Sequence, residues 1–346
     1  MTPDRWTLAI EGGAFAPPDG PVLVMGARAD SDFSALGAAT CVQGFAPDHD
    51  RLKARGETVL VAPEGQFAAA LVQVTKSRAG TLSMIAEALG HLPAGGLLMV
   101  DGQKEEGVEA VLKLLRAAFE VDGVMSKAHG KLAWLRRPVD LSAQVTDWIA
   151  APTQTGAGYL TVPGGFSADG PDRGSEILVA LVPQLSGRVA DWGAGWGYVA
   201  GEVLDEQPGI EALDLVEADH AMLEAARINV ADPRAAFHWA DVNRFTPAAP
   251  YDAILCNPPF HVGRRADPGL GRAFIASAAR NLTARGRFFM VANRHLPYED
   301  TLKAVFGAGS MLGELEGYKI YEASKPRTGA KPGAKRAPVH NSRERN

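Results

Sequence analysis

Cysteine is scarce in this chain of 346 residues, which contains Cys41, Cys256 and no others. Two cysteines so far apart form neither a disulfide framework nor a zinc-ligand pair, which favours a reducing compartment. Long apolar runs are lacking too, because the first twenty residues hold no apolar core of signal-peptide length. The uncharged stretch from Trp148 to Ala168 is too rich in Pro, Gly, Thr and Gln to span a bilayer. We therefore expect a cytoplasmic protein without a membrane segment.

Motifs for metal binding and covalent catalysis are missing as well. The sequence contains no H-E-x-x-H and no G-x-S-x-G, so we expect neither a metal nor a covalent nucleophile. The net charge of −5 divides unevenly, with +6 on residues 323–346 and −11 on the rest. An acidic body is not typical of a general nucleic-acid binder, although a local basic mouth and a basic tail remain compatible with RNA. We expect residues 323–346 to form a disordered tail.

Strand-length apolar runs alternate with amphipathic stretches along the chain, which predicts an α/β fold with mostly parallel sheets and helices on both faces. The two halves share this order, and LPAGGLLMV in the first half matches LTARGRFFMV in the second. We interpret the similarity as an internal duplication, although unrelated doubly wound domains can also look alike. The predicted division is a first domain at 1–140, a linker at 141–165, a second domain at 166–322 and the tail. The predicted strands are 22–25, 58–62, 69–74, 97–101, 130–135, 188–191, 212–217, 236–239, 252–257, 286–292 and 318–322.

A glycine-rich loop, DWGAGWG, follows the first predicted strand of the second domain. Its G-x-G-x-G spacing is a weak signal alone, and each nearby acid could be an ordinary rim residue. Together they are more specific: Asp191 suits an ammonium, Glu217 the hydroxyls of a ribose and Asp241 an adenine amino group. This set favours S-adenosylmethionine over a dinucleotide such as NAD. The predicted cofactor residues are Asp191, Gly193, Gly195, Gly197, Glu217 and Asp241.

The stretch NPPF follows the next apolar run and lies at the same predicted sheet edge as the glycine loop. Prolines fix φ and donate no hydrogen bond, so the Asn257 side-chain oxygen and the Pro258 carbonyl can act as two fixed acceptors. They would hold an exocyclic amino group and aim its lone pair at the cofactor's methyl, while Phe260 stacks on the base. The alternative to a binding site is a purely structural Pro-Pro turn at the end of a strand. The first half has TKSR (75–78) at the matching place, which suggests that only the second half does chemistry.

Together, DWGAGWG, Glu217, Asp241 and NPPF resemble the Rossmann-like S-adenosylmethionine-dependent methyltransferases that modify exocyclic or amide nitrogens. The segments GYLTVPGGFSADGPDRGSEILV, NPPFHVG and VANRHLPYEDTLKAVFG resemble the bacterial 16S rRNA guanine-N2 methyltransferases of the small-subunit type. The resemblance covers about residues 158–323. It implies two tandem methyltransferase-like domains, the first degenerate, and a guanine of ribosomal RNA, within the small subunit or its precursor, as the methyl acceptor.

The resemblance also implies roles for residues around these motifs. Phe166 would close over the site, and Ser175, which opens the next helix, would approach the carboxylate end of the cofactor. His261 would line the pocket wall, whereas Arg264 and Arg265 belong either to a solvated loop or to a phosphate-binding mouth. The family often has cysteine where this chain has an equally small alanine between the first two loop glycines. We expect a monomer.

Other acceptors remain compatible with these residues. Adenine N6 in RNA or DNA, or a protein glutamine amide, could occupy the same Asn-Pro-Pro-aromatic clamp. A non-catalytic ribosome assembly factor and an NAD-dependent oxidoreductase are further alternatives. Cofactor binding separates a catalyst from an inactive factor, and the labelled acceptor identifies the substrate.

Overall fold

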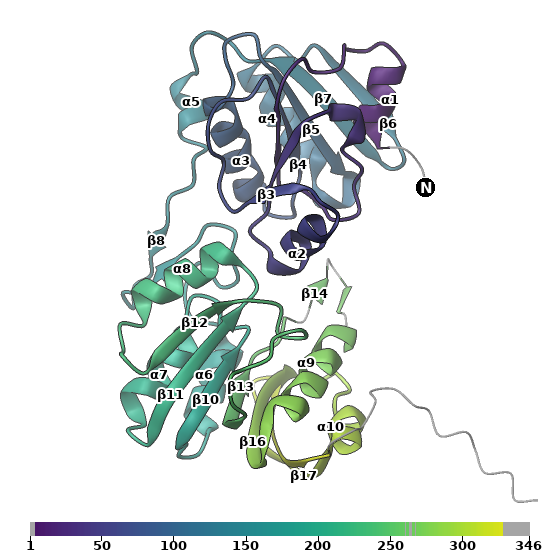
Figure 1. The fold of residues 1–346 in the computed structure, drawn as a ribbon. Helices are drawn as coiled ribbons and strands as arrows, with labels where there is room; N and C mark the ends of the chain where they lie inside the picture. The colour runs from purple at the N-terminus through teal and green to yellow at the C-terminus, as the bar shows by residue number, and fades with distance from the viewer. Residues whose placement is uncertain (1–3, 260, 263–264, 267, 328–346) are drawn as a thin grey trace, which may run out of the picture.

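A computed structural model gives the fold and describes residues 4–259, 261–262, 265–266 and 268–327. Figure 1 shows two α/β units, with the segment that carries β8 running between them along one side. Each unit contains one seven-stranded sheet with helices packed on both faces. This architecture confirms the predicted tandem, mostly parallel α/β fold.

The first sheet has the strand order β3-β2-β1-β4-β5-β7-β6. Neighbours from β3 to β5 run parallel, whereas β7 pairs antiparallel with both β5 and β6. Its strands are β1 (Val22–Met25), β2 (Ala39–Val42), β3 (Thr58–Leu60), β4 (Ala69–Gln73), β5 (Leu97–Gln103), β6 (Gly123–Lys127) and β7 (Gly130–Arg136). The helices are α1 (Arg5–Glu11), α2 (Ala46–Ala54), α3 (Arg78–Gly90), α4 (Val108–Ala118) and α5 (Ala143–Thr146), with single 3-10 turns η1 (Ser34–Leu36) and η2 (Lys104–Glu106).

The second sheet repeats this order as β12-β11-β10-β13-β16-β18-β17. Its strands are β10 (Gly187–Trp192), β11 (Ile210–Glu217), β12 (Ala235–Trp239), β13 (Tyr251–Cys256), β16 (Leu282–Asn293), β17 (Phe306–Leu315) and β18 (Tyr318–Pro326). The helices are α6 (Arg173–Leu181), α7 (Tyr198–Glu206), α8 (His220–Asn229), α9 (Pro268–Asn281) and α10 (Glu299–Val305). Two short pairs complete the fold: β8 (Thr153–Gln154) with β9 (Leu160–Thr161), and β14 (His261–Val262) with β15 (Arg265–Ala266). Position-by-position agreement of the two orders supports an internal duplication.

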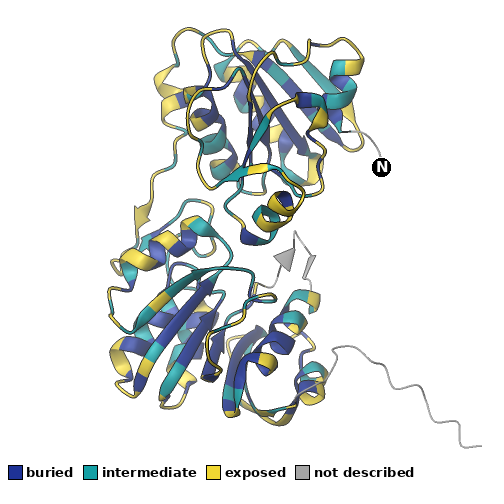
Figure 2. Cartoon of the chain, in the orientation of Figure 1, coloured by how far each residue is buried: buried dark blue, intermediate teal, exposed yellow. Residues whose placement is uncertain are grey.

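The central strands read as uninterrupted apolar runs because helices cover both faces of each sheet. All four residues of β1 are buried, as are the last four of β13. Figure 2 shows this burial as dark blue strands in the middle of each unit. Two buried clusters fill the second unit, one with Trp192 and Phe274 on the α9 side and one with Leu213 and Phe289 on the other.

The predicted strands were right for most of the two large sheets. The strands β2, β6 and β17 were missed, because their faces are partly exposed and their apolar runs are short; of these, β6 and β17 lie at sheet edges. The predicted linker is not a bare connection, since it contains α5, β8 and β9. The predicted tail boundary at residue 323 falls within β18, which continues to Pro326 because residues 323–324 still pair with β16.

The two units touch through backbone hydrogen bonds beside α2. Ala46 N donates to the Ala218 carbonyl at 2.8 Å, and His220 N donates to the Gly44 carbonyl at 2.9 Å. Trp239 Nε1 also donates to the Gly44 carbonyl, at 3.0 Å. The second unit contributes the loop after β11 and the end of β12 to this junction. The first unit therefore contacts the two segments whose strand ends carry Glu217 and Asp241.

No helix within the described ranges is long and apolar enough to cross a membrane. Over the same ranges, no group of three or more His, Cys, Asp or Glu side chains is arranged to hold a metal ion.

Candidate active site

The glycine loop joins β10 to α7 through a backbone that requires glycine. Gly193, Gly195 and Gly197 have φ values of 74°, 57° and 89°, all in the left-handed region that side chains with a Cβ disfavour. At Gly197 there is no room either, because a Cβ would lie 2.8 Å from Val230 Cγ2. The loop is therefore fixed by conformation and packing, and its backbone borders a cavity at the carboxyl end of β10.

Glu217 holds this loop in place from the end of β11. Its carboxylate accepts one hydrogen bond from Gly195 N and another from Asp219 N, both at 2.8 Å. Burial raises the pKa of Glu217, while the two backbone donors oppose the shift. Each carboxylate oxygen can accept a further bond, so the predicted contact with ribose hydroxyls remains chemically open.

Asp241 follows β12 and forms a local turn. Its Oδ1 accepts from Asn243 N at 2.8 Å and from Asn243 Nδ2 at 3.1 Å. Asp241 is absent from the residues that line the cavity beside the glycine loop. Its predicted contact with an adenine amino group stays a prediction.

Asp191 has the burial and the negative charge that suit a bound cation. The residue is 2% exposed, and its Oδ2 is buried with no hydrogen-bond partner among the described residues. Burial, followed by the charge of Glu217, raises the pKa of Asp191 to about 7. An unpaired buried carboxylate is costly unless a cation or donor meets it. The ammonium of S-adenosylmethionine has the required charge, so these residues fit the cofactor.

Asn257 lies at the tip of β13, next to the glycine loop in the parallel sheet. Its Nδ2 donates to Asp172 Oδ2 at 2.9 Å and to Ser175 Oγ at 2.7 Å. Both partners belong to the start of α6. The opposite atom of the amide, Oδ1, is buried and has no partner within the described part of the chain. The amide is thus held by its nitrogen and offers its oxygen as a free acceptor, as the two-acceptor interpretation requires.

The structure brings most of the predicted cofactor loop together with Asn257. One cavity is lined by Phe166, Ser167, Asp172, Ser175, Asp191, Gly193, Ala194, Gly195, Trp196, Tyr198, Val199 and Asn257. Phe166 is 56% exposed at this cavity, and its carbonyl accepts a hydrogen bond from Trp196 Nε1 at 3.2 Å. Pro258 is buried beside Asn257. The side chains of Phe260, His261, Arg264 and Arg265 lie outside the described residues, so their predicted roles stay predictions.

Sequence reasoning missed Asp172 and assigned Ser175 only to the cofactor. Asp172 is the N-cap residue of α6 and accepts from Ser175 N at 3.1 Å. The signal was the sequence PDRGS, in which an aspartate precedes a helix by one position. That signal predicts a helix start, whereas the contact with Asn257 joins residues 85 positions apart and becomes visible only in the folded chain.

The corresponding amide in the first sheet is already paired at both ends. The last register pair of β10 and β13 is Trp192↔Cys256, and that of β1 and β4 is Met25↔Val72, so Gln73 occupies the position of Asn257. The matching residue is therefore Gln73, two positions before the predicted stretch 75–78. Both ends of its amide are satisfied, by Arg28 N at 2.8 Å and Ser31 Oγ at 2.9 Å. A bidentate Arg5–Asp101 pair lies beside it.

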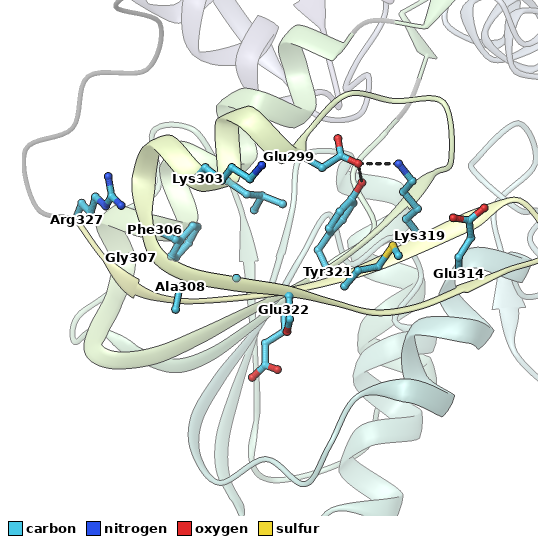
Figure 3. Close-up of a pocket in the computed structure, with 14 residues that line it drawn as sticks. Glu299, Lys303, Phe306, Gly307, Ala308, Glu314, Lys319, Tyr321, Glu322 and Arg327 are labelled. Atoms are coloured by element: carbon cyan, nitrogen blue, oxygen red, sulfur yellow. Dashed lines mark hydrogen bonds and ion pairs between the residues drawn. The ribbon is translucent and has the colours of Figure 1, made fainter.

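Another cavity, of about 530 Å³, lies between α10 and the β17–β18 edge of the second sheet. Figure 3 shows Glu299 pointing at Lys319 and Tyr321 above this groove. Glu299 Oε1 accepts from Lys319 Nζ at 2.6 Å and from the Tyr321 hydroxyl at 2.7 Å. The groove shares no residue with the cavity at the glycine loop. Its polar groups stabilise the sheet edge.

This ion pair predicts an acid-sensitive contribution to stability. Burial opposes ionisation, but the Lys319 and Tyr321 hydrogen bonds outweigh it and lower the pKa of Glu299 to about 2. The contribution is therefore present above the unfolded value of 4.5 and is lost as pH falls towards 2. Because the side chain is 41% exposed, we expect Glu299→Gln to cost about 1 kcal/mol or less at neutral pH. Urea unfolding at several pH values would measure this, and a difference that persists at low pH would contradict it.

Comparison with known proteins agrees with the site. Residues 157–322 match the methyltransferase small domain family. The chain is 32% identical over 238 residues to the ribosomal RNA small subunit methyltransferase C of Shewanella sp. (strain MR-4), covering 67% of this chain and 69% of that protein. The Shewanella pealeana protein of the same name is 31% identical over 267 residues, covering 75% and 78%. Among solved structures, the T. thermophilus 16S rRNA N2 G1207 methyltransferase, in complex with AdoMet and guanosine, superposes with a TM-score of 0.76 at 23% identity, covering 93% of this chain and 92% of that chain.

The repeated, mostly parallel sheet, the glycine loop and the buried Asp191 beside it define a class I S-adenosylmethionine-dependent methyltransferase. The cofactor is S-adenosylmethionine. Within that class, the chain belongs to the ribosomal RNA small subunit methyltransferase C family.

Proposed function

We propose that this protein methylates the exocyclic N2 of a guanine in 16S rRNA, at the position that corresponds to G1207 of the T. thermophilus substrate. The acceptor would be the small subunit or its precursor in the cytoplasm. The observation that carries the proposal is the buried Oδ1 of Asn257, which has no partner among the described residues and lies at the strand tip beside Asp191. A neutral acceptor in that place suits an amino group on a planar base.

The chain's own residues would bind and orient both reactants. Asp191 accepts the cofactor's ammonium, and the loop of Gly193, Gly195 and Gly197 lets the backbone approach it. When bound, S-adenosylmethionine would supply an electrophilic methyl for transfer to the guanine nitrogen, leaving S-adenosylhomocysteine and one proton to be released. Asn257 Oδ1 and the Pro258 carbonyl each accept one N–H of the guanine amino group. These acceptors stabilise the positive charge that develops on nitrogen.

We assign different roles to the two domains and to the tail. The second domain, from residue 166, carries both reactant sites. The first domain, up to residue 140, would act as a scaffold for docking the RNA, since the amide of Gln73, which stands at the position of Asn257, is already paired by Arg28 N and Ser31 Oγ. The tail beyond Arg327 adds four net positive charges and would strengthen RNA binding in a salt-dependent way. We expect the protein to act as a monomer without a metal.

The test is methyl transfer from labelled S-adenosylmethionine by the full-length protein. Small subunits, naked 16S rRNA, DNA and a glutamine-bearing release factor are compared as acceptors, and digested RNA is analysed for N2-methylguanosine. We expect label in N2-methylguanosine of 16S rRNA, mapped to one nucleotide, and none with Asn257→Ala. Label in adenine, DNA or protein instead would overturn the guanine assignment. Cofactor binding with no transfer to any acceptor would favour an assembly factor.

A further inference from the structure

The Asn257 amide is held from one side by two groups at the start of α6. Nδ2 donates to Asp172 Oδ2 and Ser175 Oγ, at 2.9 Å and 2.7 Å, while Oδ1 remains unpaired among the described residues. An ionised carboxylate has only acceptor oxygens, so Asp172 can pair with the amide nitrogen and would repel the amide oxygen. The neighbouring carboxylate therefore selects one of the two possible amide orientations.

The packing at the start of α6 supports this contact. Asp172 Oδ2 also accepts from Ser175 N, so capping α6 places the carboxylate and the hydroxyl together. Gly174, one of the two residues between them, leaves room, because a Cβ there would lie 2.9 Å from Asp172 Oδ2 and 3.0 Å from Tyr318 Cε1. Ser175 is 7% exposed, so little solvent competes for its hydroxyl.

We propose that Asp172 and Ser175 are positioning residues, which fix the Asn257 amide with its oxygen towards the substrate amino group. Without them the amide could turn its NH2 towards that group, and two donors would face each other. This inference rests on the proposed function for its substrate, but the amide orientation itself can be measured without any acceptor. The effect should fall on turnover rather than on cofactor affinity, since both side chains are bonded to the Asn257 amide.

Three variants separate positioning from helix capping. Ser175→Ala removes one acceptor and keeps the cap, which uses the Ser175 backbone. Asp172→Ser keeps a good N-cap residue but replaces the strict acceptor with a shorter group that can also donate. Asp172→Asn is the conservative control, because its amide oxygen can accept from both Ser175 N and Asn257 Nδ2.

We expect Ser175→Ala and Asp172→Ser each to lower kcat by roughly 10- to 100-fold, as lost outer contacts do at other sites. The cofactor Kd and the Tm should change little, and Asp172→Asn should keep most of the activity. Methyl transfer to the rRNA acceptor gives kcat, and calorimetry gives Kd. Equal kcat for wild type, Ser175→Ala and Asp172→Ser would reduce Asp172 to a helix cap and overturn the proposal. Parallel losses of kcat and cofactor affinity would overturn it too, because they would make these residues cofactor ligands.

A second measurement does not depend on the acceptor. In the wild-type protein, the two Nδ2 protons of Asn257, assigned by their absence in Asn257→Ala, should exchange slowly with solvent in NMR spectra. They should exchange faster in Ser175→Ala and Asp172→Ser. Fast exchange in the wild type would overturn the inference even if the enzyme methylates rRNA. Slow exchange that these variants abolish would support it even if the acceptor is not rRNA.

Discussion

Replacing Asn257 with alanine is expected to lower kcat for methyl transfer by about 1,000-fold, while cofactor affinity changes less than about threefold. Removal of one preorganised partner of a developing charge costs this much in other enzymes. In the proposed reaction the side chain also holds one N–H of the amino group, so orientation would be lost together with charge stabilisation. Within the described residues the Asn257 side chain bonds to Asp172 and Ser175 and not to the glycine loop, which is why cofactor binding should survive.

The first sheet offers a matched control for this experiment. Gln73 stands at the same register position and is 2% exposed, but its amide is fully paired within its own unit. Gln73→Ala should therefore lower the free energy of unfolding by about 1–3 kcal/mol and leave the kcat of the folded protein unchanged. Single-turnover methyl transfer and urea unfolding measure the two effects. Loss of cofactor binding in Asn257→Ala would make Asn257 a cofactor or folding residue instead.

Replacing Asp191 with asparagine is expected to remove cofactor binding and stabilise the free protein. The carboxylate is the buried group that fits the cofactor's ammonium, so its loss should weaken binding by at least about 100-fold. In the free protein, burial and Glu217 raise the pKa of Asp191 to about 7, compared with 3.8 for an exposed group. Its contribution to stability is therefore full below about pH 4 and is lost as pH rises through 7.

Asparagine avoids the charge, so Asp191→Asn should exceed the wild type by about 2–4 kcal/mol at pH 8, and the difference should shrink towards pH 4. Wild-type cofactor affinity should also fall below about pH 7, where binding must displace a proton. Denaturant unfolding without cofactor, and calorimetry with it, measure these effects across pH. Glu211→Gln, an exposed change on β11, serves as the control and should alter neither quantity. A less stable Asp191→Asn protein that still binds the cofactor would contradict the assignment.

Sequence reasoning succeeded where a short pattern carries the physical cause. The loop glycines are recognisable because a left-handed turn needs them, and the central strands because burial on both faces demands an apolar run. It failed at β17, whose partly exposed residues show no clear alternation, and it placed the counterpart of Asn257 two residues too late. Register depends on pairing with β1, which no local pattern encodes.

By itself, therefore, the sequence determined the residue types, the duplicated order of strands and helices along the chain, and the placement of Asn257 and Asp191 at one sheet edge. Those properties follow from periodicity and from the rule that parallel strands end together. Only the tertiary structure decided which way the Asn257 amide faces, that Glu217 bonds to Gly195, and that burial raises the pKa of Asp191. Hydrogen-bond direction and pKa are set by neighbours in space, and here those neighbours lie 22 to 85 residues away along the chain.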